Sequence, residues 1–466
     1  MLRRNTVDDC RYSLLARRAV AVTISWVLLA LVAACVPIPT DPTTAQTVSA
    51  DPATNPAIHT DATTEGVTQT EPPTDRDVLV ALYHATNGDN WVKNDNWMSE
   101  APVDRWYGVV ATSDDRAIEL DLSENGLSGS IPSELGNLIN LKSLNLYNNR
   151  LSGSIPPELG NLINLETLDF RNNLLRGTIP PELGGLAELK WLELSDNWLR
   201  GTVPPELSKL TELEWLGLAN NRLFGEIPPE LGMLTELEWL ELSNNGLIGT
   251  VPPELGMLSR LEWLGLSGNG LIGTVPPELG MLSRLEWLDL SDNGLTGAIP
   301  PELGMLTELE WLELSENGLT GTIPPELGML TRLEWLGLSD NGLTGTVPQE
   351  LGELIQLKVL YLSSNQLSGS IPSELGKLIN LTILDLWNNE LSGAIPSELG
   401  RLTKLTRLDL WDNELSGAIP PELGKLTNLS ELYLSENQLK GCIPEVWRNV
   451  EVGDLETLVL PFCDEE

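Results

Sequence analysis

Leucine recurs along this chain in a strictly periodic frame, and the period is 24. In the copy at 285–308, LEWLDLSDNGLTGAIPPELGMLTE, Leu stands at positions 1, 4, 6 and 11 and Asn at position 9. Apolar and polar residues alternate over positions 3 to 7, which predicts a short strand with the Leu of positions 4 and 6 facing a core. The Asn of the repeated copies are Asn125, Asn149, Asn173, Asn197, Asn221, Asn245, Asn269, Asn293, Asn317, Asn341, Asn365, Asn389, Asn413 and Asn437.

A fixed period of this length predicts a solenoid, in which each unit buries its apolar face only against its neighbours. One strand per coil then stacks into a parallel sheet, and the segment P-x-E-L-G-x-L predicts a short helical turn on the outer side. The expected fold class is therefore an α/β repeat solenoid. The Gly at position 13 of every copy suits a positive φ, and the following Pro fixes the return path.

The repeated Asn is polar but stands within an apolar stretch. A buried amide is tolerated only when its donors and acceptor are satisfied. We therefore expect each Asn to bond backbone groups at the bend between neighbouring coils.

The full pattern, L-x-x-L-x-L-x-x-N-x-L-x-G-x-I-P, resembles the plant-specific class of leucine-rich repeats and covers residues 117–452 in fourteen copies. The resemblance implies a horseshoe or superhelix with a parallel β-sheet on the concave face and short helical turns on the convex face. It also implies interaction with a protein or another ligand, without naming one.

The first 35 residues have the layout of a signal peptide, with arginines followed by the uncharged stretch AVAVTISWVLLALVAA. That stretch is short for a membrane span. It ends in Val-Ala-Ala-Cys35, which resembles the bacterial lipobox. The resemblance implies an exported protein held at the cell surface by lipid on Cys35. Ordinary secretion and an uncleaved anchor are the alternatives.

Between this leader and the repeats lie two different segments. Residues 36–74 are rich in Pro, Thr, Ala and Asp and lack aromatic residues, which predicts a disordered linker. Residues 75–116 begin with a one-sided helical pattern and continue with Trp91, Trp97 and Trp106, which predicts an N-terminal cap over the first coil. The stretch NWMSEAPVDRWYGV resembles the cap of plant-type leucine-rich repeat proteins, but the cysteines that flank that cap are missing here.

Residues 453–466 form the expected C-terminal cap. Leu455, Leu458 and Leu460 repeat the strand frame, and Cys463 falls where Asn belongs. In an exported protein, Cys442 and Cys463 predict a disulfide. A zinc site would need further ligands, which the sequence does not place nearby, so no metal site is predicted.

The net charge and the motifs present narrow the classes of partner and of activity that the sequence allows. The formal charge of −39 argues against nucleic acid as a partner and favours cationic ones. No phosphate-cradling loop or nucleophile elbow is present, and the repeats contain no His. We expect no enzyme and no cofactor. Repeated, equivalent carboxylates also lack the differing environments that glycoside hydrolysis requires, so that activity is the least favoured alternative.

The candidate binding surface is the concave face, to which positions 3, 5, 7 and 8 point. Position 3 is Trp in seven consecutive copies, and carboxylates stand beside this row at position 5. Such a surface is typical of protein, peptide or glycan recognition. Alternatively, the row reflects duplication and stacking, and the solenoid serves as a structural or adhesive spacer. The candidate residues are Trp191, Trp215, Trp239, Trp263, Trp287, Trp311, Trp335, Glu193, Glu241, Asp289, Glu313, Tyr361, Trp387 and Trp411.

Overall fold

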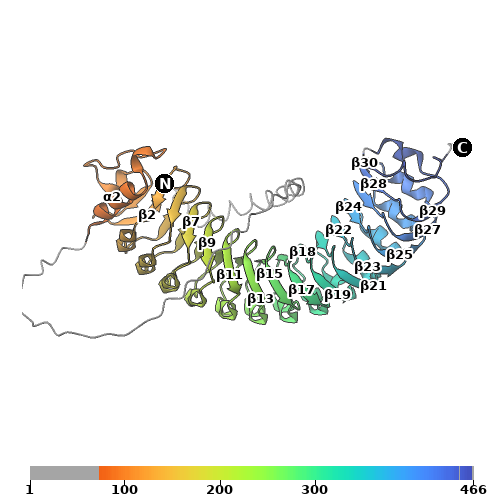
Figure 1. The fold of residues 1–466 in the computed structure, drawn as a ribbon, viewed down its shortest axis with the longest axis horizontal. Helices are drawn as coiled ribbons and strands as arrows, with labels where there is room; N and C mark the ends of the chain where they lie inside the picture. Colours follow the sequence, from red (N-terminus) through yellow and green to blue (C-terminus); the bar gives the residue numbers. More distant parts are fainter. Residues whose placement is uncertain (1–72, 451, 464–466) are drawn as a thin grey trace, which may run out of the picture. The chain divides into compact units, whose positions relative to one another are not determined.

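The computed structural model describes residues 73–450 and 452–463. The expected signal peptide with Cys35, and the linker up to residue 72, lie outside the described residues. The unit from Glu71 onward is a curved stack of coils, with one sheet along its inner side (Figure 1). No helix in the described ranges is long and apolar enough to cross a membrane.

A small aromatic layer covers the first coil. Helix α2 (Asp75–Ala85) begins with a capping box between Thr74 and Asp77 and buries Val78, Leu79, Leu82 and Tyr83. Two 3₁₀ turns follow, η1 (Gly88–Asn90) and η2 (Val103–Arg105). The three expected Trp are buried beside the helix, where neighbouring indoles lie 4.8–4.9 Å apart. They exclude water from the open end of the leucine core.

The first sheet contains sixteen strands, which are parallel except for the antiparallel pair β1 and β2. Each repeat strand covers only positions 3 to 5 of its coil, so it is shorter than the alternation predicts. The strands are β1 (Val109–Ala111), β2 (Ala117–Asp121), β4 (Ser143–Asn145), β6 (Thr167–Asp169), β8 (Trp191–Glu193), β10 (Trp215–Gly217), β12 (Trp239–Glu241), β14 (Trp263–Gly265), β16 (Trp287–Asp289), β18 (Trp311–Glu313), β20 (Trp335–Gly337), β22 (Val359–Tyr361), β24 (Ile383–Asp385), β26 (Arg407–Asp409), β28 (Glu431–Tyr433) and β30 (Val452–Gly453).

A second parallel sheet of fourteen strands, which the sequence analysis did not predict, follows the Asn bend of each coil. Its strands begin at or near position 10, and the position-13 Gly within or just after each has the expected positive φ, for example +83° at Gly273. The strands are β3 (Ser128–Ser130), β5 (Arg150–Gly153), β7 (Leu174–Gly177), β9 (Trp198–Gly201), β11 (Arg222–Glu226), β13 (Gly246–Thr250), β15 (Gly270–Gly273), β17 (Gly294–Gly297), β19 (Gly318–Thr322), β21 (Gly342–Thr346), β23 (Gln366–Gly369), β25 (Glu390–Gly393), β27 (Glu414–Ala418) and β29 (Gln438–Lys440).

The predicted helical turns are present as five-residue 3₁₀ helices that pack coil against coil. A Cβ on Gly280 would collide with the backbone oxygen of Glu302 in the next coil, so only Gly permits this approach. The turns are η3 (Ser133–Asn137), η4 (Pro157–Asn161), η5 (Pro181–Gly185), η6 (Pro205–Lys209), η7 (Pro229–Met233), η8 (Pro253–Met257), η9 (Pro277–Met281), η10 (Pro301–Met305), η11 (Pro325–Met329), η12 (Gln349–Glu353), η13 (Ser373–Lys377), η14 (Ser397–Arg401), η15 (Pro421–Lys425) and η16 (Glu445–Asn449).

The core and the Asn ladder form as predicted. Leu288 and Leu290, at positions 4 and 6, are fully buried, and burying one such side chain contributes about 1.5–3 kcal/mol. Asn389 donates to the carbonyls of Leu362, Leu386 and Trp387 at 3.0–3.2 Å, and its Oδ1 accepts from the Leu367 amide at 3.0 Å. The side-chain amide thus connects its own coil to the preceding one and leaves none of its polar atoms unsatisfied.

The C-terminal end departs from the repeat. A disulfide joins Cys442 and Cys463, and Ile443 pairs with Phe462 in an isolated parallel bridge. The expected strand frame at Leu455, Leu458 and Leu460 is wrong, because the last strand is β30 and a turn follows it. The Asp454 carboxylate accepts from the amides of Leu434 and Ser435, so it caps the preceding coil instead of continuing the sheet.

Candidate functional site

Seven Trp side chains form one stacked column on the first sheet, which we call the Trp ladder. Each is the first residue of its strand, and neighbouring strands pair Trp with Trp in register. Adjacent ring centroids lie 4.0–4.2 Å apart, with interplanar angles of 10–12°. The ladder consists of Trp191, Trp215, Trp239, Trp263, Trp287, Trp311 and Trp335.

Stacking leaves little of each indole for a ligand. Trp215 is buried and the other six are half-buried. Because the inner rungs have both faces against neighbouring rings, a bound molecule would meet ring edges. The row is therefore less exposed than its sequence position suggests.

The predicted carboxylates tie the rungs together. The indole Nε1 atoms of Trp215, Trp263 and Trp335 donate to Glu193, Glu241 and Glu313 of the preceding coils at 2.8, 2.8 and 2.6 Å. In each case the next coil has Gly at position 5, at Gly217, Gly265 and Gly337. A Cβ there would collide with the Glu carboxylate, so Gly provides the space through which Glu reaches the indole.

In the Trp ladder, the buried indole nitrogens of Trp239 and Trp311 make no hydrogen bond within the described residues. The coil before Trp239 has Gly217 at position 5 and offers no side chain. The coil before Trp311 has Asp289, which instead accepts from the amide and hydroxyl of its own Ser291 at 3.0 and 2.6 Å. Hydrogen bonding along the ladder is therefore discontinuous.

Burial raises the pKa of several of these carboxyl groups. It raises the pKa of Glu241 and of Asp289, partly offset by hydrogen bonds from Ser243 and Ser291 respectively. It also raises the pKa of Glu313 to about 7, with a further contribution from the negative charge of Asp289. Repulsion along the column thus disfavours full ionisation near neutral pH.

At its C-terminal end the aromatic row leaves position 3. Trp335 meets Tyr361 edge-on at 5.2 Å and 61°, and Tyr361 stands at position 5. Trp387 and Trp411 stand at position 7, just beyond β24 and β26. Their rings are 5.9 Å apart and tilted by 48°, so they do not stack face to face. The aromatic residues thus move from position 3 to positions 5 and 7 toward the C-terminal end of the sheet.

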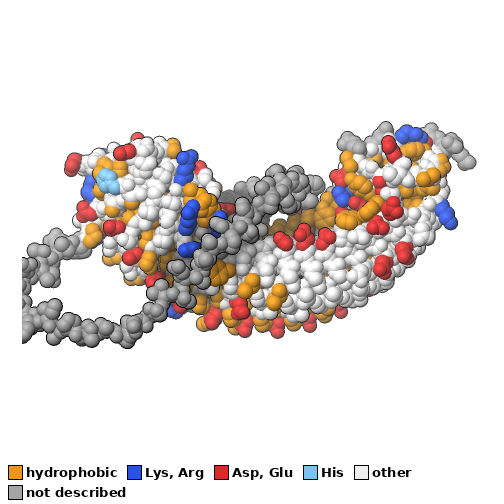
Figure 2. All heavy atoms as spheres, viewed as in Figure 1, with side chains coloured by type: hydrophobic (Ala, Val, Ile, Leu, Met, Phe, Trp, Pro, Cys, Tyr) orange, Lys and Arg blue, Asp and Glu red, His pale blue; other side chains and the backbone are white. Residues whose placement is uncertain are grey.

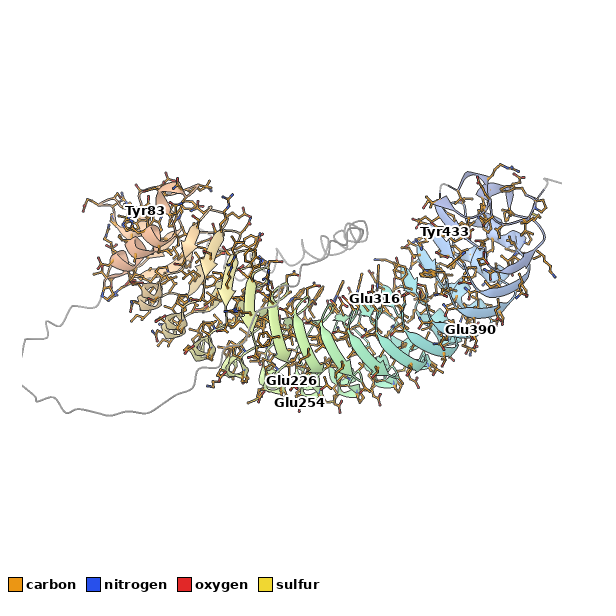
Figure 3. The ribbon with its side chains drawn as sticks, in the orientation of Figure 1. Tyr83, Glu226, Glu254, Glu316, Glu390 and Tyr433 are labelled. Atoms are coloured by element: carbon orange, nitrogen blue, oxygen red, sulfur yellow. A yellow bond between two sulfur atoms is a disulfide. The ribbon has the colours of Figure 1, made fainter. Side chains whose placement is uncertain are left out.

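Arg407 lies among carboxylates beside these aromatic rings. Its guanidinium contacts Asp385 at 3.3 Å, Asp409 at 2.9 Å and Glu431 at 2.8 Å, and lies 5.5 Å from the centre of the Tyr433 ring. Figure 3 shows Tyr433 on the inner side of the coil stack. We call Tyr361, Asp385, Trp387, Arg407, Asp409, Trp411, Glu431 and Tyr433 the C-terminal cluster.

The C-terminal cluster carries more negative than positive charge. Burial and the neighbouring Asp409 raise the pKa of Asp385 to about 7, and burial with the charge of Asp385 raises the pKa of Tyr361 to about 12. Asp385 Oδ1 and Arg407 Nε are buried and make no hydrogen bond within the described part of the chain. Aromatic edges over incompletely satisfied polar groups suit a ligand that has both apolar and polar parts.

The sequence analysis missed Asp385, Arg407, Asp409 and Glu431. They occupy positions 3 and 5 of their coils, the positions that also identified the Trp row. A search for repetition passes over Arg407 because no other coil has Arg at position 3. The remaining predicted site, Cys442 and Cys463, is structural and lies at the end of the stack. Within the described ranges, no group of three His, Cys, Asp or Glu could hold a metal ion.

The sequence of the chain matches a known protein family. The model of the leucine-rich repeat region matches residues 119–247, 251–370 and 340–458. These ranges cover more than half of the chain, so the chain belongs to the leucine-rich repeat family. No curated protein matches the sequence.

Several solved structures share the fold. The plant peptide hormone receptor RGFR1 in complex with RGF2 is 39% identical with a TM-score of 0.69, over 72% of this chain and 54% of that one. The Arabidopsis receptor kinase HAESA, in complex with the peptide hormone IDA and the co-receptor SERK1, is 35% identical with a TM-score of 0.70, over 81% and 68%. The Leptospira interrogans protein LIC12759 is 35% identical with a TM-score of 0.52, over 68% and 84%. The chain thus spans about half the length of RGFR1.

Proposed function

We propose that this protein is an exported, cell-surface binding protein that recognises a peptide or an extended protein segment along its concave face. The observation that carries the proposal is the C-terminal cluster, where tilted aromatic rings surround incompletely satisfied polar groups. Trp411 keeps 37% of its surface exposed, and Trp387 beside it is not stacked face to face with it. Aromatic and Arg side chains of this kind anchor ligands in protein interfaces.

In this proposal, the Trp ladder supports the surface and the C-terminal cluster provides the specific contacts. The ladder aligns the coils of its seven rungs and offers indole edges along the concave face, whereas the rings of Trp387 and Trp411 are not stacked face to face. The printed descriptions of RGFR1 and HAESA name peptide ligands, which supports a peptide over a glycan here. The disulfide fits export, and lipid attachment at Cys35 would provide the tether.

A peptide library displayed on phage, panned against the purified protein, tests this proposal. The variant Trp387→Ser/Trp411→Ser should lose at least about tenfold in affinity for the selected peptides, because aromatic anchors dominate such interfaces. Met281→Ser/Met305→Ser is the matched control, because it also removes two exposed apolar side chains, but from the 3₁₀ turns of the opposite side. Equal retention of peptides by both variants would contradict a concave-face site.

A structural spacer is the second candidate, and the face-to-face packing of the Trp ladder favours it. Replacing Trp239, Trp263 and Trp287 by Ser separates the two functions. In our proposal, this variant loses stability and keeps peptide binding once folded, because the anchors lie beyond Trp335. If panning yields no peptide that the wild-type protein retains, the spacer explanation is preferred.

A further inference from the structure

An arginine-rich surface lies on the second sheet, separate from the concave face. Arg176 of β7, Arg200 of β9 and Arg222 of β11 are exposed and surround Trp198. The Arg176 guanidinium lies 4.5 Å and that of Arg222 5.5 Å from the Trp198 ring centre. Figure 2 shows Lys and Arg side chains gathered over β7 and β9, beside hydrophobic side chains.

The three arginines are unusual because they face one another without acids. Arg200 and Arg222 are register partners on neighbouring strands, an arrangement that is destabilising for like charges. Within the described residues, none of the three forms an ion pair or a hydrogen bond with a carboxylate, although Asp and Glu outnumber Lys and Arg by 67 to 28 in the chain. Folding alone therefore does not account for this cluster.

Trp198 holds the arginines in place. Cation–π contact with the indole restricts the long Arg side chains before any ligand arrives, which lowers the entropy lost on binding. A stacked guanidinium keeps its N–H groups free at the edge, where they suit bidentate contact with a carboxylate. Arg176 and Arg222 flank the Trp198 ring, which keeps 38% of its surface exposed.

An uncovered apolar strip continues from the arginines along the same face. Phe224, Ile248 and Ile272 are 55%, 54% and 56% exposed. Their register partners on the next strands are Gly246, Gly270 and Gly294, so no side chain of the register partner on the next strand lies against them. An acidic residue, Glu226, lies beside this apolar strip. It follows Phe224 on β11 and pairs in register with Ile248. We call Arg176, Trp198, Arg200, Arg222, Phe224, Ile248 and Ile272 the lateral patch.

We propose that the lateral patch docks a partner protein through an extended segment with acidic residues at one end and apolar residues at the other. Carboxylates pair with the three guanidiniums, and apolar side chains cover Phe224, Ile248 and Ile272. The patch crosses five strands from β7 to β15, which is about 19 Å at ~4.8 Å per strand and corresponds to about six residues of extended chain. Aromatic and Arg enrichment is typical of protein interfaces.

The experiment uses an array of hexapeptides with every combination of glutamate and leucine. The wild-type chain should retain peptides in which a glutamate block adjoins a leucine block, better than all-glutamate or all-leucine peptides. Arg176→Ser/Arg200→Ser/Arg222→Ser should weaken this binding by at least about tenfold, the loss expected from even one strong charge-assisted hydrogen bond. Phe224→Ser should weaken it while leaving the charges intact.

The control is Arg260→Ser/Arg284→Ser/Arg332→Ser, which removes the same charge from exposed arginines outside the lateral patch. It should bind the peptides like the wild-type chain. Urea unfolding of Arg200→Ser/Arg222→Ser should show no loss of stability, since the pair repels.

Three outcomes would overturn the proposal. The first is a wild-type chain that retains no hexapeptide, and the second is equal loss in the patch and control variants. The third is stronger binding to phosphatidylglycerol vesicles or to heparin than to any peptide, which would assign the patch to a lipid surface or a sulfated glycan. Peptides selected on the concave face should still bind the patch variant, so this test is independent of the proposed function.

Discussion

Glu313 should make the stability of the solenoid depend on pH. Its folded-state pKa is raised from 4.5 to about 7, so the folded protein binds a proton that the unfolded chain releases. Because the raised pKa favours the protonated carboxyl in the folded state, this group stabilises the fold most below pH 4.5. Its contribution to the free energy of unfolding is lost as the pH rises to about 7. One pKa unit corresponds to about 1.36 kcal/mol, so ionised Glu313 costs about 3 kcal/mol above pH 7.

The variant Glu313→Gln removes this titration and keeps an acceptor oxygen. The carboxylate accepts from Ser315 N through Oε1 and from Trp335 Nε1 through Oε2, and Gln can keep only one of these bonds, at a cost of about 1 kcal/mol. The free energy of unfolding of the variant should therefore be about 1 kcal/mol lower than that of the wild-type chain near pH 4.5. Relative to the wild-type chain, the variant should gain about 2.5 kcal/mol between pH 5 and pH 8.

Urea unfolding followed by tryptophan fluorescence, at several pH values from 4.5 to 8.5, measures this difference. The control is Glu278→Gln, which makes the same substitution at an exposed Glu of turn η9 and should change the free energy of unfolding by only a small amount. A constant difference between Glu313→Gln and the wild-type chain across this range would refute the assignment of a raised pKa to Glu313.

Three further changes test other parts of the structure. Asn389→Ala should lower the free energy of unfolding by about 3 kcal/mol in urea titrations, because the Leu367 amide and the buried carbonyls of Leu362 and Leu386 lose their partner; an effect below about 0.5 kcal/mol would contradict the Asn ladder. Gly280→Ala should cost about 2 kcal/mol from the collision with the Glu302 carbonyl, and a thermal midpoint equal to that of the wild-type chain would show that this contact can relax. Replacing Cys442 and Cys463 by Ser should cost about 3 kcal/mol for a loop of 21 residues, and limited proteolysis should then cut first in the last coil; cleavage elsewhere would argue against that.

The sequence predicts the coil well because the period is strict. Each position of the repeat occupies the same environment in fourteen coils, so its residue preference is clear. Leu288, Asn389 and Gly273 have the predicted burial, hydrogen bonds and positive φ for that reason. The second sheet was missed because positions 10 to 13 offer only one buried Leu between two exposed residues and then a Gly, a pattern too short to predict a strand. Those strands form because coils of identical length bring the same backbone groups into register.

The candidate site was harder to predict because it depends on side-chain conformation. The sequence predicts a row of Trp with carboxylates beside it, but it does not reveal that neighbouring indoles stack face to face and leave only edges. The carboxylates were expected to border the row, whereas they lie between its rungs and accept indole hydrogens. Arg407 is the one Arg at position 3 of the repeats, so repetition carries no information about it.

The alternation of Glu and Gly at position 5 affects how this solenoid could change in length during evolution. Two neighbouring coils form a unit in which one coil provides the Glu and the next provides the Gly that leaves room for its carboxylate. Glu193 with Gly217 and Glu241 with Gly265 are such units. Gain or loss of two whole coils would leave every such unit intact, whereas gain or loss of one coil would place two Glu or two Gly side by side. The ladder should therefore lengthen more readily by pairs of coils, although a single coil is the unit of the fold.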